Sequence, residues 1–133
     1  MKIPKVLLQQ GELNAYSEEG HARKAEFHKD GAKFLRSLAA ELELPKGSYD
    51  VRSNLGGIAV SGEVTLHHER LYMWMQESLG SRGRVILTYR SCEGRKDYSG
   101  GRNNDVYVAN LADPDRLEEF LSRCRSILNR AVA

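Results

Sequence analysis

Residues 57–76 read GIAVSGEVTLHHERLYMWMQ, and an alternation of apolar and polar side chains runs through both halves of this stretch. In the first half, the apolar side chains fall on even positions, namely Ile58, Val60, Val64 and Leu66. Strict alternation is typical of a β-strand with one buried face, because successive side chains point to opposite sides. We therefore expect two antiparallel strands that bury the same face.

The link between these two strands sets their register. A turn at residues 68–69 places Leu66 opposite Leu71 and, on the other face, Glu63 opposite Trp74. His-Glu is not a pair that two-residue turns prefer, so the same faces could also pair in a shifted register.

An amphipathic helix is predicted on each side of this hairpin. The first follows a candidate N-cap at Ser17 and carries an apolar stripe of Phe27, Phe34, Leu35, Leu38, Ala39 and Leu42. Gly31 lies inside this pattern and marks either a close packing contact or a break into two helices. The second helix begins after Asp113, with Pro114 at its first position, and its stripe contains Leu117, Phe120, Leu121, Cys124, Ile127 and Leu128.

Three further strands are predicted at residues 49–54, 84–92 and 105–111, which gives an antiparallel meander of about five strands. Because each helix has a single apolar stripe, both should cover the same sheet face, so the expected fold is a two-layer α+β sandwich. One domain spans residues 1–133. Residues 1–16 are expected to form an arm or an edge strand, and residues 94–104 a mobile loop that buries nothing.

Composition is that of an ordinary globular protein with 133 residues, 41% hydrophobic and 29% charged. No run of about 18 apolar residues is present, so no membrane span is expected. Cys92 and Cys124 are expected to be reduced core thiols, and the default location is the cytoplasm. The arginine-rich basic set is compatible with a bacterial source. The net charge of +2 is spread evenly, which counts against a phosphate-neutralising nucleic-acid binder.

The sheet face without helices should carry an unusually apolar set of side chains. Its members are Ala59, Glu63, Thr65, His67, Tyr72, Trp74, Ile86, Thr88, Arg90, Tyr107 and Ala109. A patch of this kind usually marks an interaction site. Three interpretations stay open: the N-terminal segment or the long loop covers the face, a second copy covers it, or another macromolecule binds there.

Self-association is the leading functional hypothesis, since two-fold homodimers are the commonest oligomers. In this hypothesis Trp74 anchors the contact and Tyr72 and Tyr107 flank it, while Arg90 and Glu63 set its register. The chain is then a small non-enzymatic interaction protein that needs no cofactor.

Single-stranded nucleic-acid binding by the same face is the alternative hypothesis. The three aromatic side chains would stack on bases, and the phosphates would meet Arg52, Arg90, Arg95, Lys96 and Arg102. Residues 82–102 hold six basic and two acidic groups, which favours this hypothesis locally. The aromatic and glycine motif of an RNA-recognition domain is absent.

An enzyme is the third possibility, with a site near His67 and His68. The sequence contains no nucleophile elbow, Walker loop, dinucleotide-binding glycine pattern or H-E-x-x-H zinc motif. The histidine pair with Glu69 offers too few converging ligands for a metal, so no metal site is predicted.

Overall fold

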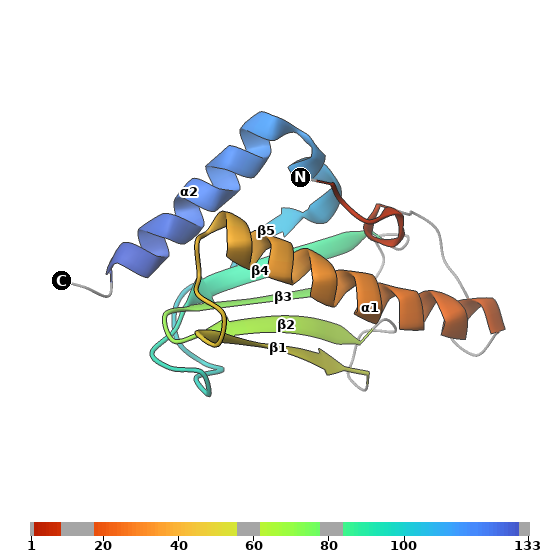
Figure 1. Cartoon of the computed structure of the whole chain (residues 1–133), viewed down its shortest axis with the longest axis horizontal. Helices are drawn as coiled ribbons and strands as arrows, with labels where there is room; N and C mark the ends of the chain where they lie inside the picture. The colour runs from red at the N-terminus through yellow and green to blue at the C-terminus, as the bar shows by residue number, and fades with distance from the viewer. Residues whose placement is uncertain (1, 9–17, 56–61, 78–83, 131–133) are drawn as a thin grey trace.

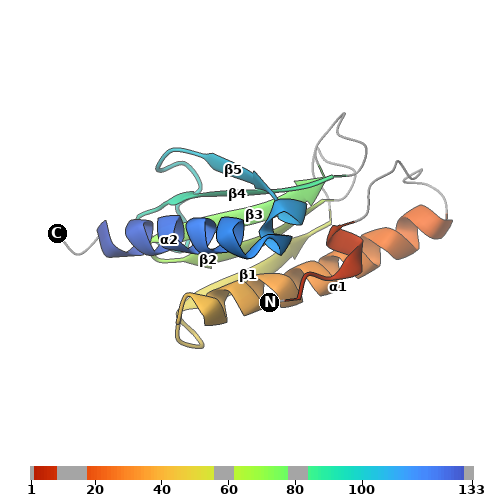
Figure 2. The ribbon, with the colours of Figure 1, turned by 90° about the horizontal axis from the view of Figure 1, so that it is seen from above.

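The computed structural model describes residues 2–8, 18–55, 62–77 and 84–130. Within them, one antiparallel sheet has the order β1-β2-β3-β4-β5, so consecutive strands are neighbours. The strands are β1 (Tyr49–Asn54), β2 (Glu63–His68), β3 (Leu71–Glu77), β4 (Val85–Ser91) and β5 (Asn104–Tyr107). Helices α1 (Glu18–Glu41) and α2 (Pro114–Arg130) lie on the same side of this sheet (Figures 1 and 2). The predicted two-layer α+β sandwich is confirmed.

The core lies between the helices and one sheet face, which we call the inner face. The fully buried strand side chains of this face include Val64, Leu66, Met73, Met75 and Leu87. The helices contribute their predicted apolar stripes, including Phe34 and Leu38 from α1 and Phe120 and Cys124 from α2. Burial of this apolar surface is the dominant stabilising contribution to the fold.

Helix α1 runs through Gly31 without a break. A Cβ atom at Gly31 would lie 3.3 Å from both the Met75 Cε and the Val64 Cγ2 atoms. Gly31 therefore marks a close approach of the helix to β2 and β3, which was one of the two predicted alternatives. Ser17, the predicted N-cap, lies outside the described residues.

The predicted register of the β2–β3 hairpin is wrong by two residues. Leu66 lies opposite Met73, and Thr65 lies opposite Trp74. The backbone N–H of Arg70 donates a hydrogen bond of 3.1 Å to Nδ1 of His68, which supports a turn one residue later than predicted. A shift of two residues leaves every side chain on its predicted face, because the side-chain period of a strand is also two.

Strand β5 ends earlier than predicted, because a 3-10 helix occupies Val108–Ala112. Val108 and Leu111 are both buried, and three-residue spacing suits a 3-10 turn instead of a strand. The next element, α2, begins as predicted: the N–H of Asp115 donates a hydrogen bond of 3.0 Å to Oδ1 of Asp113.

The N-terminal segment packs on the helix side of the molecule. Lys5–Leu7 forms a 3-10 helix, and Ile3, Val6 and Leu7 join the inner core. The described residues 2–8 thus form no edge strand, and they do not cover the opposite sheet face.

Both cysteines are free and buried, as predicted. The Cys92 thiol donates to the His68 carbonyl at 3.1 Å, and burial raises its pKa. Burial also raises the pKa of Cys124 to about 12. Among the described helices, none has the length and apolar character required to cross a membrane.

Candidate functional site

The sheet face opposite the helices, here called the outer face, is organised in three cross-strand rows. The strand register defines a first row of Asp50, His67, Tyr72 and Arg90. It defines a middle row of Arg52, Thr65, Trp74, Thr88 and Asp105. A far row contains Asn54, Glu63, Gln76, Ile86 and Tyr107. All the predicted strand-borne binding residues lie in these rows.

The loop between β4 and β5 folds back over the first row. The Tyr98 ring approaches His67 and Tyr72 edge-on, with ring centroids 5.2 and 5.7 Å away. Arg52 donates a hydrogen bond of 2.7 Å to the Tyr98 hydroxyl, and Arg90 donates another to the Tyr98 carbonyl. His67 is consequently fully buried, and Tyr72 and Arg90 are only 7% and 9% exposed. The expectation that this loop buries nothing is wrong, and the open alternative that the long loop covers this face is confirmed for the first row. The mobility of the loop stays a prediction.

Asp97 gives this loop its shape through its own backbone. Its carboxylate accepts hydrogen bonds of 3.0 Å from the N–H groups of Ser99 and Gly100 and one of 2.9 Å from Glu93. These donors, led by Ser99, lower the pKa of Asp97. The loop is therefore a folded cap with local support.

Trp74 lies where the covered and uncovered parts of the outer face meet. The Arg90 guanidinium lies 5.2 Å from the ring centroids of both Tyr72 and Trp74, and the two rings are 4.9 Å apart. Burial, followed by the nearby Glu63 carboxylate, raises the pKa of Tyr72. Trp74 stays partly exposed, and a buried guanidinium and a buried ring support it from one side.

The remaining predicted strand residues lie around Trp74. Tyr107 is partly exposed, with the Arg84 guanidinium 4.4 Å from its ring centroid. Glu63 is also partly exposed, and Arg52 forms an ion pair of 3.1 Å with Asp50. The structure therefore places the predicted aromatic and charged residues on one continuous face.

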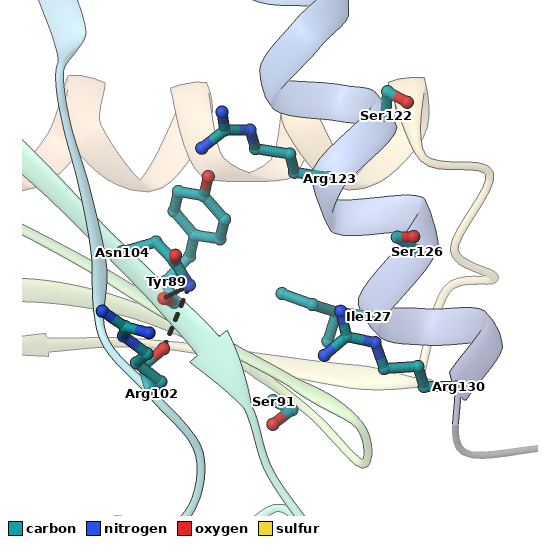
Figure 3. Close-up of a pocket in the computed structure, with 9 residues that line it drawn as sticks. All are labelled: Tyr89, Ser91, Arg102, Asn104, Ser122, Arg123, Ser126, Ile127 and Arg130. Atoms are coloured by element: carbon teal, nitrogen blue, oxygen red, sulfur yellow. Dashed lines mark hydrogen bonds between the residues drawn. The ribbon is translucent and has the colours of Figure 1, made fainter.

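The predicted loop contacts do not stay together. Arg95 donates to the Gly47 carbonyl and lies 3.7 Å from Asp50, and Lys96 is exposed. Arg102 instead lines a hollow on the helix side, together with Arg123 and Arg130 of α2 (Figure 3). The sequence prediction missed these two α2 residues. Their seven-residue spacing, which places both on one side of a helix, was the available signal.

The histidine pair shows no catalytic geometry. Within the described part of the chain, no hydrogen bond joins the ring of His67 or of His68 to a carboxylate. The described residues also contain no group of three or more His, Cys, Asp or Glu side chains placed to hold a metal ion. These observations give the enzyme hypothesis no geometric support.

Comparison with protein-family models, curated proteins and solved structures gives no match to this chain. The site must therefore be interpreted from its own geometry.

Proposed function

We propose that the chain is a non-enzymatic interaction protein that forms a two-fold dimer through the middle and far rows of its outer face. The arrangement of charges on these rows is the observation that supports this proposal. β3 is the central strand of the sheet, with β1 and β5 at opposite edges. In the middle row, Arg52 lies on the β1 edge and Asp105, of opposite charge, lies on the β5 edge.

A two-fold axis parallel to β3, lying between two stacked sheets, pairs β1 of one copy with β5 of the other. In the middle row this brings Arg52 over Asp105 of the partner subunit and Trp74 over Trp74 of the partner subunit. In the far row, Glu63 lies over the partner's Ile86, whose strand is preceded by Arg84. The surface is thus complementary to itself, as an isologous contact requires, and sheets stack well in near-aligned orientations.

The covered first row has a supporting role in this proposal. Tyr72 and Arg90 are buried within the single chain, so they hold Trp74 in place instead of contacting the partner. A preorganised aromatic side chain loses little conformational freedom on binding, which favours association. The free, buried thiols are what a cytoplasmic location would favour.

Truncation of the central anchor tests the dimer. An aromatic anchor in a desolvated interface commonly contributes about 2 kcal/mol or more. Trp74→Ala should therefore lower the mass measured by light scattering from twice 15.0 kDa to 15.0 kDa. Leu8→Ala is the control, because Leu8 is an exposed apolar residue of the helix-side segment. A folded Trp74→Ala variant with an unchanged dimeric mass would contradict the proposal.

Charge exchange tests the proposed axis itself. Asp105→Arg alone should weaken the dimer, because it would face Arg52 of the partner subunit. Adding Arg52→Glu should restore the dimer, since each copy would then again present opposite charges. Arg52 also bonds to Tyr98, so amide NMR spectra must show that the loop keeps its place in the double variant. A double variant with an intact loop that dimerises no better than Asp105→Arg would exclude this axis.

Single-stranded nucleic-acid binding by the same face is the competing proposal. The position of Arg102 on the opposite side of the sheet counts against it. The two proposals differ in what adds mass: the dimer forms without an oligonucleotide, whereas phosphate contacts require one and weaken steeply as salt rises. A monomer that gains mass with a short oligonucleotide only at low salt would favour nucleic-acid binding over the dimer.

A further inference from the structure

A second candidate site lies on the helix side of the sheet, between α2 and the β4–β5 edge. It is a hollow of about 450 Å³, within the range of small-molecule sites. Its lining is polar and contains no carboxylate: Tyr89, Ser91, Arg102, Asn104, Ser122, Arg123, Ser126, Ile127 and Arg130 (Figure 3). Three arginine side chains thus line one hollow, and no Asp or Glu side chain lines it.

Two of these guanidinium groups are available for a ligand. Within the described residues, the guanidinium groups of Arg102 and Arg130 form no ion pair and no hydrogen bond. Arg123 is partly occupied, because it pairs with Glu119 at 2.8 Å and bonds to the Tyr89 hydroxyl. Arg102 and Arg130 come from the loop side and the helix side of the hollow, so they can approach one ligand from two directions (Figure 3).

We propose that this hollow binds the phosphate group of a small phosphate monoester. Guanidinium groups match phosphate oxygens with paired, charge-assisted hydrogen bonds. The hydroxyls of Ser122 and Ser126 supply neutral donors along the same wall. Asn104 is already held in place, since its amide donates to the carbonyls of Tyr89 and Arg102 at 3.3 and 3.0 Å. Its two bonds fix the Arg102 backbone beside the hollow.

Part of the nearby negative charge is compensated. The C-terminal end of α2 would disfavour an anion, but Arg70 donates a hydrogen bond of 3.4 Å to the Leu128 carbonyl there. An adjoining hollow of about 650 Å³ shares Ser91, Ile127 and Arg130 and leaves space for the rest of the ligand. Glu93 and Asp97 line that second hollow, and the carboxylate of Asp97 accepts the loop N–H groups.

Ligand titration of the full chain tests this proposal. The probes are inorganic phosphate, adenosine monophosphate, and a trinucleotide with and without a terminal phosphate. We expect amide shifts in ¹⁵N–¹H NMR spectra at Ser91, Asn104 and Ser126 with each phosphate-bearing probe. Tighter binding of adenosine monophosphate would identify a nucleotide as the ligand, and equal binding would identify the phosphate alone. Equal binding of the trinucleotide with and without its terminal phosphate would overturn the monoester proposal.

Matched variants distinguish phosphate binding in the hollow from nonspecific electrostatic attraction of phosphate to the protein surface. Arg102→Gln with Arg130→Gln should weaken phosphate binding by at least about tenfold, because each loses charged hydrogen bonds. Arg36→Gln with Arg116→Gln removes the same charge from exposed positions outside the hollow and should change affinity by less than about twofold. Equal losses in both variants, or no binding at millimolar phosphate, would overturn the proposal.

This site and the proposed dimer can fail separately. The hollow lies on the helix side and the dimer contact on the outer face, so Trp74→Ala should leave phosphate affinity unchanged. Loss of phosphate binding in a folded Trp74→Ala monomer would contradict the placement of the site within a single chain.

Discussion

The two faces of the sheet are closed in different ways. Two helices close the inner face with apolar side chains such as Leu66 and Phe34, whose burial needs no particular hydrogen-bond geometry. A loop closes one end of the outer face, through the Tyr98 ring and through directional hydrogen bonds from Arg52 and Arg90. The difference indicates that apolar burial on the inner face contributes most to the stability of the fold, whereas directional hydrogen bonds hold the loop on the outer face.

Neighbouring residues on opposite faces give the largest expected contrast. Leu66 is fully buried on the inner face, and its truncation to alanine should destabilise the fold by about 2–5 kcal/mol. Thr65→Ala on the outer face should destabilise it by less than about 1 kcal/mol. Urea unfolding of the two variants measures both changes. Equal losses would show that the outer face contributes to the core as much as the inner face does.

Two glycines with positive φ angles provide the next contrast, one in the loop between β4 and β5 and one in the link between α1 and β1. At Gly101, φ is 75° and a Cβ atom would lie 2.5 Å from the Ser91 carbonyl oxygen. Gly47 has a φ of 85°, with nothing within 4 Å of a Cβ atom. Both alanine variants incur the left-handed backbone penalty of about 1 kcal/mol or more, but only Gly101→Ala adds a clash with the backbone.

We therefore expect Gly101→Ala to destabilise the chain more than Gly47→Ala and to displace the loop from the first row. Faster amide exchange near Tyr98 in Gly101→Ala alone would show this displacement. If the two variants have equal stability and equal exchange, the loop does not depend on its close contact with β4.

The inner face was predictable from the sequence because burial follows a simple period. The stripes of α1 and α2 and the inward side chains of β2–β4 all repeat regularly, and they survive a register error of two residues. Closure of the outer face was not predictable in this way. It depends on Tyr98, Arg52 and Arg90, which are far apart in sequence and meet only through the path of a loop that Asp97 shapes.

The sequence could not predict which basic loop residues lie near which face of the sheet, because this too depends on the path of the loop. Arg95 and Arg102 belong to one loop, yet they lie near opposite faces of the sheet, because the chain between them folds over the first row and returns to β5. Arg123 pairs with Glu119, four residues earlier on α2, at 2.8 Å. Its contribution to the helix-side hollow arises from the packing of α2 against β4.

The smallest expected effect concerns His67, which the loop between β4 and β5 buries. Burial lowers the pKa of His67 below its ordinary value of 6.5, and the charge of Arg52 adds to this shift, while the backbone of Gly94 and Asp97 and the Asp97 carboxylate oppose it. The unfolded chain therefore binds this proton more readily than the folded chain. The contribution of His67 to the free energy of unfolding should be constant above the ordinary pKa and should fall as pH decreases through 6.5.

Replacement of His67 by phenylalanine separates this titration from others. A phenylalanine ring can keep the contacts with Tyr72 and Tyr98, but it has no group that binds a proton. His68, whose pKa burial also lowers, remains in both proteins, so the difference between them isolates His67. Urea unfolding at about pH 7.5 and about pH 5.5 should show a smaller loss of stability in His67→Phe than in the unaltered chain. Identical losses would mean that the loop opens freely enough to hydrate His67, and the outer face would then be closed only weakly.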